Sequence, residues 1–152
     1  MLYRALLAFL ALPGIFAGIL PAYISTHDSY RMTGSISGIV LMFFGTVILL
    51  WCVRDFLVSG RGTLAPWDPP KNLVIVGLYR YSRNPMYVGI IIMLGGWVIY
   101  AGSPLLAIYT AFMATAFYVR VVFGEERILA HQFGDEWFDY TKSVARWLPG
   151  IG

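Results

Sequence analysis

The residues of this chain that could do chemistry fall in two places far apart in the sequence. The first is the segment 77–89, which reads Gly-Leu-Tyr-Arg-Tyr-Ser-Arg-Asn-Pro-Met-Tyr-Val-Gly, and the second is the acidic pair Glu125-Glu126. Both adjoin long apolar segments, where ionisable groups are rare and usually mark a functional site. Arginine binds carboxylates through paired hydrogen bonds, and a carboxylate accepts hydrogen bonds from hydroxyl or ammonium groups. The two places therefore indicate a site for a polar ligand.

The composition indicates an integral membrane protein. Of the 152 residues, 59% are hydrophobic and 12% are charged, whereas soluble domains average about 45–50% apolar and about 25% charged residues. This length suits one compact domain, which we expect to cover residues 1–152.

Several classes of function are disfavoured by the rest of the composition. The single cysteine, Cys52, excludes an internal disulfide and a CxxC metal site. The two histidines lie far apart in the chain, so we expect no metal centre. The net charge is +3 without a basic face, which argues against nucleic-acid binding.

Four apolar segments predict an all-α, multi-pass transmembrane protein. They cover residues 2–24, 36–53, 85–100 and 104–123, and a span needs about 20 apolar residues. Pro13 predicts a bend in the first segment. The third is short and contains Gly95-Gly96, so it either packs closely on a neighbour or borders a thinned region.

The distribution of basic residues predicts the orientation. Ten of them would lie on one side of the membrane: Arg4, Arg54, Arg61, Lys71, Arg80, Arg83, Arg120, Arg127, Lys142 and Arg146. Only Arg31 would lie on the other side. Because Lys and Arg accumulate on the cytoplasmic side, both termini and the site are expected to face the cytosol.

The connection between the third and fourth segments brings the polar residues together. It reads Ala101-Gly102-Ser103-Pro104, with Ser103 suited to the N-cap and Pro104 to the first helical position. A connection this short predicts an antiparallel hairpin, which places the start of one helix beside the end of the other. The residues expected to converge are Arg83, Asn84, Tyr87, Arg120, Glu125 and Glu126. Taken singly, the Arg and Glu residues are also explained as interfacial charges paired with one another or with lipid phosphates, and Tyr79, Tyr81 and Tyr87 as aromatic residues of the membrane interface.

Two further segments flank this hairpin. Residues 56–76 predict a loop without regular secondary structure, acting either as a lid or cavity wall or as a membrane-interface anchor through Trp67. After Glu126, apolar residues at helical spacing predict one or two amphipathic helices on the membrane surface, broken at Gly134, and then an extended tail. His131 is interpreted as a solvated interface residue, with a catalytic base as the alternative. Trp137 and Trp147 are interpreted as interface anchors, with platforms that stack on adenine as the alternative.

In order and spacing, these motifs resemble the isoprenylcysteine carboxyl methyltransferase family. The resemblance covers residues 54–149 and rests on Gly77-x-Tyr79, Arg83-Asn84-Pro85-x-Tyr87-x-Gly89, Glu125-Glu126-x-x-Leu129, Phe133-Gly134, Tyr140 and Val144-x-Arg146-x-x-Pro149. It implies a membrane-embedded enzyme that uses S-adenosylmethionine (SAM) as its methyl donor.

The resemblance also implies roles for particular residues. Those that would line the cofactor site are Tyr79, Arg83, Asn84, Pro85, Tyr87, Gly89, Glu125 and Glu126. The chemistry of the side chains, rather than the resemblance, selects the candidates for catalytic roles: Glu126 and Arg120 first, and Arg146 third. Glu126 or Tyr87 could act as a base, and Arg120 or Arg146 could hold an anionic group of the substrate. Eukaryotic members carry His at the position of Asn84, so a role for an imidazole does not transfer to this chain.

The methyl acceptor stays open at this point. A lipophilic carboxylate, thiol or amine would fit, including a prenylcysteine-like compound or a phospholipid. Two other classes of function are also compatible with the pattern. One is a nicotinamide-dependent membrane reductase of the same broad superfamily, and the other is a non-catalytic membrane partner.

Overall fold

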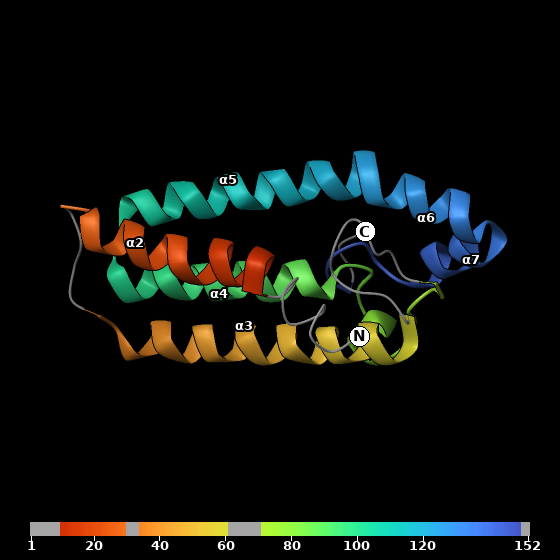
Figure 1. Ribbon diagram of the computed structural model, residues 1–152, viewed down its shortest axis with the longest axis horizontal. Coiled ribbons are helices and arrows are strands. Elements are labelled where there is room, and N and C mark those ends of the chain that lie inside the picture. The colour runs from red at the N-terminus through yellow and green to blue at the C-terminus, as the bar shows by residue number, and fades with distance from the viewer. Residues whose placement is uncertain (1–9, 30–33, 61–70, 150–152) are drawn as a thin grey trace.

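The computed structural model describes residues 10–29, 34–60 and 71–149. Within these ranges the chain forms helices joined by short connections, with no β-strand. Figure 1 shows α4 (Pro85–Ala101) lying between α3 (Ile36–Asp55) and α5 (Pro104–Arg120). The start of the first apolar segment, Arg31 and Trp67 lie outside the described residues, so their predicted roles stay predictions.

The first described helix covers one face of this bundle. It begins as the π-helical segment η1 (Leu10–Ile19), which contains Pro13, and continues as α2 (Leu20–His27). The indole of Trp97 on α4 donates to the carbonyl of Ala17 at 3.1 Å, and the hydroxyl of Tyr109 on α5 donates to the carbonyl of Phe16 at 2.7 Å. Pro21 in the first turn of α2 has no N–H to donate to the carbonyl of Ala17 four residues earlier, so the bond from Trp97 satisfies that carbonyl.

Helices α3 and α4 approach each other through glycines. A Cβ atom placed on Gly45 would come within 2.6 Å of the carbonyl oxygen of Gly89. About two turns further along α4, a Cβ atom placed on Gly96 would come within 2.7 Å of the carbonyl oxygen of Gly38 on α3. Only glycine permits this backbone contact, so the short third apolar segment packs closely on its neighbour through Gly96.

The turn between α4 and α5 has the predicted capping residues. Gly102 ends α4 with φ +57°, and the Ser103 hydroxyl accepts from the amide of Leu106 at 3.1 Å, which confirms Ser103 as the N-cap. Ser103 also donates to the carboxylate of Asp28, which follows α2. The far end of the bundle is therefore fastened by polar contacts among three helices.

Helix α5 does not end near Phe123 as the sequence suggested. It runs on through the π-helical turn η4 (Val121–Glu125) into α6 (Glu126–Phe133), because no residue there interrupts helical hydrogen bonding. Gly134, with φ +51°, then stops the helix, and α7 (Asp135–Ser143) folds back beside α6 (Figure 1). The predicted break at Gly134 is confirmed.

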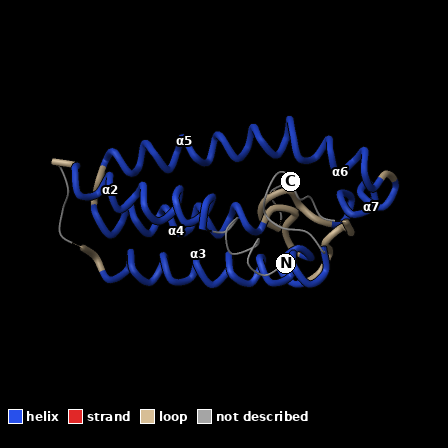
Figure 2. The backbone as a smooth tube through the Cα atoms, in the orientation of Figure 1, coloured by secondary structure: helices blue, strands red, loops and turns tan. Residues whose placement is uncertain are grey.

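The prediction of an irregular central loop is wrong at its start. The helical path of α3 continues through η2 (Phe56–Gly60), and the carbonyl of Gly60 accepts from the amide of Lys71 at 2.8 Å. The short 3₁₀ helix η3 (Gly77–Arg80) then leads to α4. Figure 2 shows a group of irregular connections at the end of the bundle where α4 begins.

In the part of the chain that the structure describes, two helices are long and apolar enough to cross a membrane. They are the continuous helices Ile36–Gly60, of 25 residues, and Pro104–Phe133, of 30 residues, whereas Pro85–Ala101 is apolar but shorter. Large apolar side chains cover the outer face of α3, including Phe43 and Phe44, which are 64% and 57% exposed. Such a surface suits lipid rather than water.

Candidate active site

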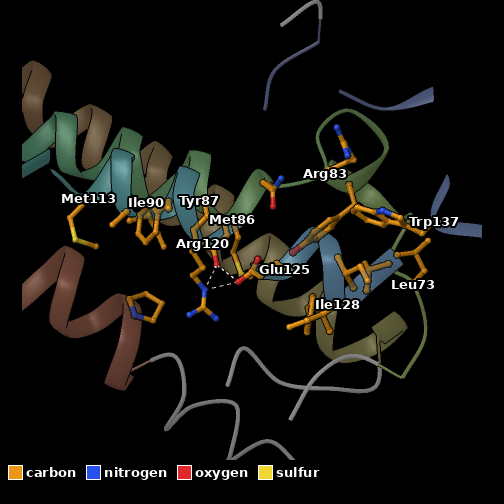
Figure 3. Close-up of a pocket in the computed structure, with 18 of the residues that line it drawn as sticks. Leu73, Arg83, Met86, Tyr87, Ile90, Met113, Arg120, Glu125, Ile128 and Trp137 are labelled. Atoms are coloured by element: carbon orange, nitrogen blue, oxygen red, sulfur yellow. Dashed lines mark hydrogen bonds and ion pairs between the residues drawn. The ribbon is translucent and has the colours of Figure 1, made fainter. Parts of the chain in front are cut away.

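The polar residues from the two motifs meet where α4 begins and α5 passes into α6. Tyr87 lies in the first turn of α4, and Arg120 ends α5. Figure 3 shows Tyr87, Arg120 and Glu125 side by side in the middle of a cavity. Residues separated by more than 30 positions in the sequence therefore contact one another directly.

The first network is centred on Glu125. Its Oε1 accepts from the hydroxyl of Tyr87 at 2.5 Å and from Nε of Arg120 at 2.6 Å. Arg120 Nε also lies 3.1 Å from the Tyr87 hydroxyl. The side chains of Arg120 and Glu125 are 49% and 30% exposed, so this network is open to the surroundings. The positive charge of Arg120 balances the negative charge of Glu125, so the net charge of this network is zero.

The second network is centred on Glu126 and is more deeply buried. Arg146 binds the carboxylate through two bonds, Nε to Oε1 at 2.9 Å and Nη2 to Oε2 at 3.0 Å. Arg83 adds a third, from Nη1 to Oε1 at 3.0 Å. The Arg83, Glu126 and Arg146 side chains are 10%, 16% and 27% exposed. Among the described residues, two guanidinium groups thus share one carboxylate.

The second network fastens the C-terminal tail across the start of α4. The amide of Arg83 donates to the carbonyl of Ala145 at 2.9 Å, and Nδ2 of Asn84 donates to the carbonyl of Arg146 at 3.0 Å. The backbone N–H of Asn84 in turn donates to the Ser82 hydroxyl at 3.1 Å. Asn84 is therefore a bridge between the motif before α4 and the tail that follows α7.

A cavity of about 530 Å³ runs along this region. In Figure 3, Met113 and Ile90 lie toward one end, Arg83, Trp137 and Leu73 toward the other, and the Glu125 network between them. The apolar end includes aromatic side chains from η1 and α5, namely Phe16, Phe112 and Phe117. The cavity thus joins an apolar compartment to a polar one, as expected for a ligand-binding site.

The polar end is shaped by aromatic residues as well as by charge. The guanidinium of Arg83 lies 5.7 Å from the centre of the Trp137 ring, a cation–π distance. The hydroxyl of Tyr140 donates to the carbonyl of Tyr79 at 2.6 Å. Burial lowers the pKa of Arg83, and its neighbour Arg146 lowers it further against the opposing effect of Glu126. The hydrogen bonds to Glu126 raise the pKa of Arg146.

The predicted site residues divide into two groups. Those that line the cavity are Tyr79, Arg83, Asn84, Tyr87, Arg120 and Glu125. Those that are not among its lining residues are Pro85, Gly89, Glu126 and Arg146. Pro85 is the buried first residue of α4, Gly89 faces α3, and Glu126 and Arg146 lie in the second network.

Sequence reasoning missed part of the cavity wall. Trp137 was predicted to be an interface anchor, but this is wrong, because its side chain is only 5% exposed and lines the cavity. It packs in one buried cluster with Tyr140 and Val144. The signal was present in the apolar spacing of Leu129, Phe133 and Trp137, which marks a buried face as well as a lipid-facing one.

Comparison with known proteins agrees with these features. The model of the family described as phospholipid methyltransferase matches residues 33–136. Protein-S-isoprenylcysteine O-methyltransferase A of Arabidopsis thaliana is 32% identical over 118 residues, which cover 75% of this chain and 58% of that protein. The protein-S-isoprenylcysteine O-methyltransferase of Mus musculus is 34% identical over 123 residues, covering 77% of this chain and 42% of that protein.

These comparisons also set the extent of the likeness. The corresponding human protein is 33% identical over 123 residues, again 77% of this chain and 42% of the relative. The chain thus spans about half the length of the curated relatives it matches. No solved structure matches it significantly. The resemblance to the isoprenylcysteine carboxyl methyltransferases is confirmed, and the chain belongs to the phospholipid methyltransferase family.

Proposed function

We propose that this protein is a membrane-embedded, SAM-dependent methyltransferase that acts on a lipophilic acceptor. The observation that carries the proposal is the cavity itself, which joins an apolar compartment between helices to a charged end in a chain of a methyltransferase family. A polar methyl donor and a lipophilic methyl acceptor can both bind in a cavity that has a polar end and an apolar end.

The residues of the polar end fit SAM, which carries a carboxylate, an ammonium group and a ribose diol. Tyr79 Oη and Arg83 Nε are buried atoms without a hydrogen-bond partner among the described residues, and both residues line the cavity. Glu125 provides a carboxylate on the same wall. The unpartnered donors of Tyr79 and Arg83 could bind the carboxylate of such a ligand, and the Glu125 carboxylate could accept from its ammonium or hydroxyl groups.

The chain contributes mainly positioning to the reaction. When bound, SAM would supply a methyl group attached to a positively charged sulfur. The nucleophilic atom of the acceptor would form a bond to the methyl carbon as the carbon–sulfur bond breaks, and the sulfur would leave with that electron pair as a neutral thioether. Alignment of two reactants lowers the barrier by several kcal/mol. Arg120 contacts Tyr87 and Glu125 only through Nε, so within the described structure its terminal nitrogens are left to bind an anionic acceptor group.

The chemistry of the acceptor decides whether a base is needed. A carboxylate acceptor is already a nucleophile, whereas a thiol or an amine must first lose a proton. Glu125 is the carboxylate on the cavity wall that would accept it. The relatives are named for O-methylation of isoprenylcysteine and the family for phospholipids. Carboxylate, thiol and amine acceptors therefore all belong in a substrate screen.

We further propose that four helices span the bilayer and that the site lies at its cytosolic edge. The basic residues Arg54, Arg83 and Arg120 support this orientation. They lie in the last turn of α3, just before α4 and at the end of α5, and these three helix ends lie at the same end of the bundle (Figure 1). Thiol labelling in oriented vesicles tests it. With Cys52 replaced by serine, Ser143→Cys should react from the cytosolic side and Thr26→Cys from the opposite side.

The first test of function is calorimetric titration of SAM into the purified protein in nanodiscs. We expect micromolar binding by the wild type and by Asp139→Asn, an exposed control on α7. Glu125→Gln and Glu126→Gln should both bind more weakly, the first through a lost contact and the second through release of Arg83. A folded wild type that binds NADPH instead of SAM would favour the reductase, and one that binds neither would favour a non-catalytic role.

A further inference from the structure

The hydroxyl of Tyr87 has two hydrogen-bond partners within the protein. It donates its single proton to Oε1 of Glu125 at 2.5 Å, and it accepts from Nε of Arg120 at 3.1 Å. Nε of Arg120 also donates to the same Glu125 oxygen, at 2.6 Å. The phenol therefore closes a triangle of hydrogen bonds among α4, α5 and η4, and its proton is already used within the protein.

The ring of Tyr87 is fixed by packing. It lies against Phe117, with the two ring centres 4.6 Å apart, and Phe117 is about one turn before Arg120 on α5. The ring also packs against the buried cluster that includes Ile90 and Met113. Packing on two helices restricts the rotamer of the side chain, so the phenol oxygen is a fixed acceptor beside the end of α5.

The side chain of Arg120 depends on this acceptor for its orientation. It is 49% exposed and binds Glu125 through Nε alone, so that one bond leaves a long side chain free to rotate. The second acceptor, Tyr87 on a different helix, restricts that rotation. Figure 3 shows the terminal nitrogens of Arg120 pointing away from Tyr87 and Glu125. Within the described residues these nitrogens have no hydrogen-bond partner, so they are oriented donors for a ligand in the cavity.

We propose that Tyr87 is a positioning residue for the methyl acceptor, because it holds the guanidinium of Arg120 so that its terminal nitrogens bind an anionic group of the acceptor. The inference rests on the proposed function, in which Arg120 binds that group. It gives Tyr87 a role in acceptor binding, whereas the motif implies a role in the cofactor site. The bonds from Tyr87 and Arg120 both end on Oε1 of Glu125, so among the described residues Oε2 is left to accept from the cofactor.

The test measures how strongly the protein prefers a charged acceptor to a neutral one. N-acetyl-S-farnesylcysteine and its methyl ester differ only in the charge of one carboxyl group. Each is titrated into the full chain in nanodiscs saturated with S-adenosylhomocysteine, with empty nanodiscs as the blank. The wild type should bind the acid at least about tenfold more tightly than the ester, and Arg120→Gln should abolish this preference. Tyr87→Phe should reduce the preference about fivefold and leave the affinities for the ester and for SAM unchanged.

A double variant distinguishes positioning from a merely structural role. Tyr87→Phe keeps the ring and its packing on Phe117, so it should fold. Combined with Arg120→Gln, it should bind the acid as tightly as Arg120→Gln alone, because the hydroxyl acts only through the guanidinium. Tyr81→Phe is the matched control and should change no affinity, since Tyr81 is 63% exposed and is not among the lining residues.

The contrary outcomes separate this inference from the proposed function. An unchanged preference in Tyr87→Phe would overturn the inference, and weaker SAM binding in that variant would make Tyr87 a cofactor ligand instead. A double variant that binds the acid more weakly than Arg120→Gln would mean that the two residues act independently. A wild type without preference for the acid, including one that binds neither compound, would remove the anion site at Arg120. In each case the methyltransferase proposal stands if the wild type binds SAM, and if it does not, the proposed function fails and this inference fails with it.

Discussion

Glu125 and Glu126 are neighbours in the sequence but belong to networks of opposite character. Glu125 faces the cavity, is matched by one arginine and is 30% exposed. Glu126 lies away from the cavity, holds two arginines and is 16% exposed. Neighbouring residues on a helix point about 100° apart, so one helical turn can serve ligand binding with one carboxylate and structure with the next.

This difference assigns different work to the two carboxylates. The exposed pair of Arg120 and Glu125 contributes little to stability, because solvent screens it. The buried group around Glu126 cannot lose its carboxylate without leaving like charges together. The Glu125 network is therefore expected to act directly on ligand binding. The Glu126 network is expected to act mainly on the folding of the site, and on ligand binding only indirectly, through Arg83.

The largest effect on stability should come from Glu126→Ala. It leaves Arg83 and Arg146 without a counter-charge, which should lower the free energy of unfolding by about 3 kcal/mol. For a chain of this size that corresponds to roughly 6–12 °C in Tm, measured by thermal unfolding in nanodiscs. The exposed Glu136→Ala serves as the control. An unchanged Tm for Glu126→Ala would remove the distinction between the two networks.

Glu125→Gln should have the opposite profile. The affinity for SAM should fall about tenfold, because a charged acceptor on the cavity wall is lost. Its Tm should change little, since an exposed ion pair contributes about 0.2–1 kcal/mol. Calorimetry and thermal unfolding of the same preparations check both halves. A large loss of Tm with unchanged affinity would reverse the roles of the two carboxylates.

A smaller effect is expected at Asn84, which joins the second network to the tail. Asn84→Ala removes the 3.0 Å bond to the carbonyl of Arg146 and should lower the free energy of unfolding by about 1 kcal/mol. Asn84→His keeps a ring N–H donor and should lose less. Equal losses for both variants, measured as Tm, would show that this hydrogen bond does not hold the tail.

The smallest effect should come from Lys142→Ala, which calibrates the value of a solvated ion pair. Lys142 and Asp139 lie 2.9 Å apart, with side chains that are 75% and 76% exposed. We expect a change within about 0.5 kcal/mol, measured as Tm in the same nanodiscs. A larger loss would mean that surface pairs in this protein count for more than the comparison assumes.

Much of the frame could be predicted because local signals are strong. Pro85 begins α4, Ser103 caps α5, and Gly134 breaks the last helix, each through backbone chemistry that the residue type dictates. The meeting of Tyr87 with Arg120 followed from the short turn at Gly102 and Ser103.

Other features could not be predicted because they depend on packing. The motif predicts that Gly89 lines the cofactor site. A glycine that lets a neighbouring helix approach closely occurs in the same sequence pattern, and Gly89 faces α3 in this way. Which of the two neighbours, Glu125 or Glu126, faces the cavity depends on the register of the helix, and the sequence shows no sign of the π-helical turn Val121–Glu125 that alters this register. Trp137 lies on an apolar helix face, and the sequence pattern of such a face is the same whether it packs against lipid or against protein.

The tail is held by its main-chain oxygens, and this has a consequence for mutagenesis. The bonds from Arg83 and Asn84 end on the carbonyls of Ala145 and Arg146, which every amino acid possesses. Saturation mutagenesis at Ala145 should therefore be nearly silent, however severe the substitution looks on paper. A stop codon after Ser143 removes both acceptors and the Arg146 side chain that binds Glu126 at once. Ala145 should therefore tolerate substitution far better than the tail tolerates shortening.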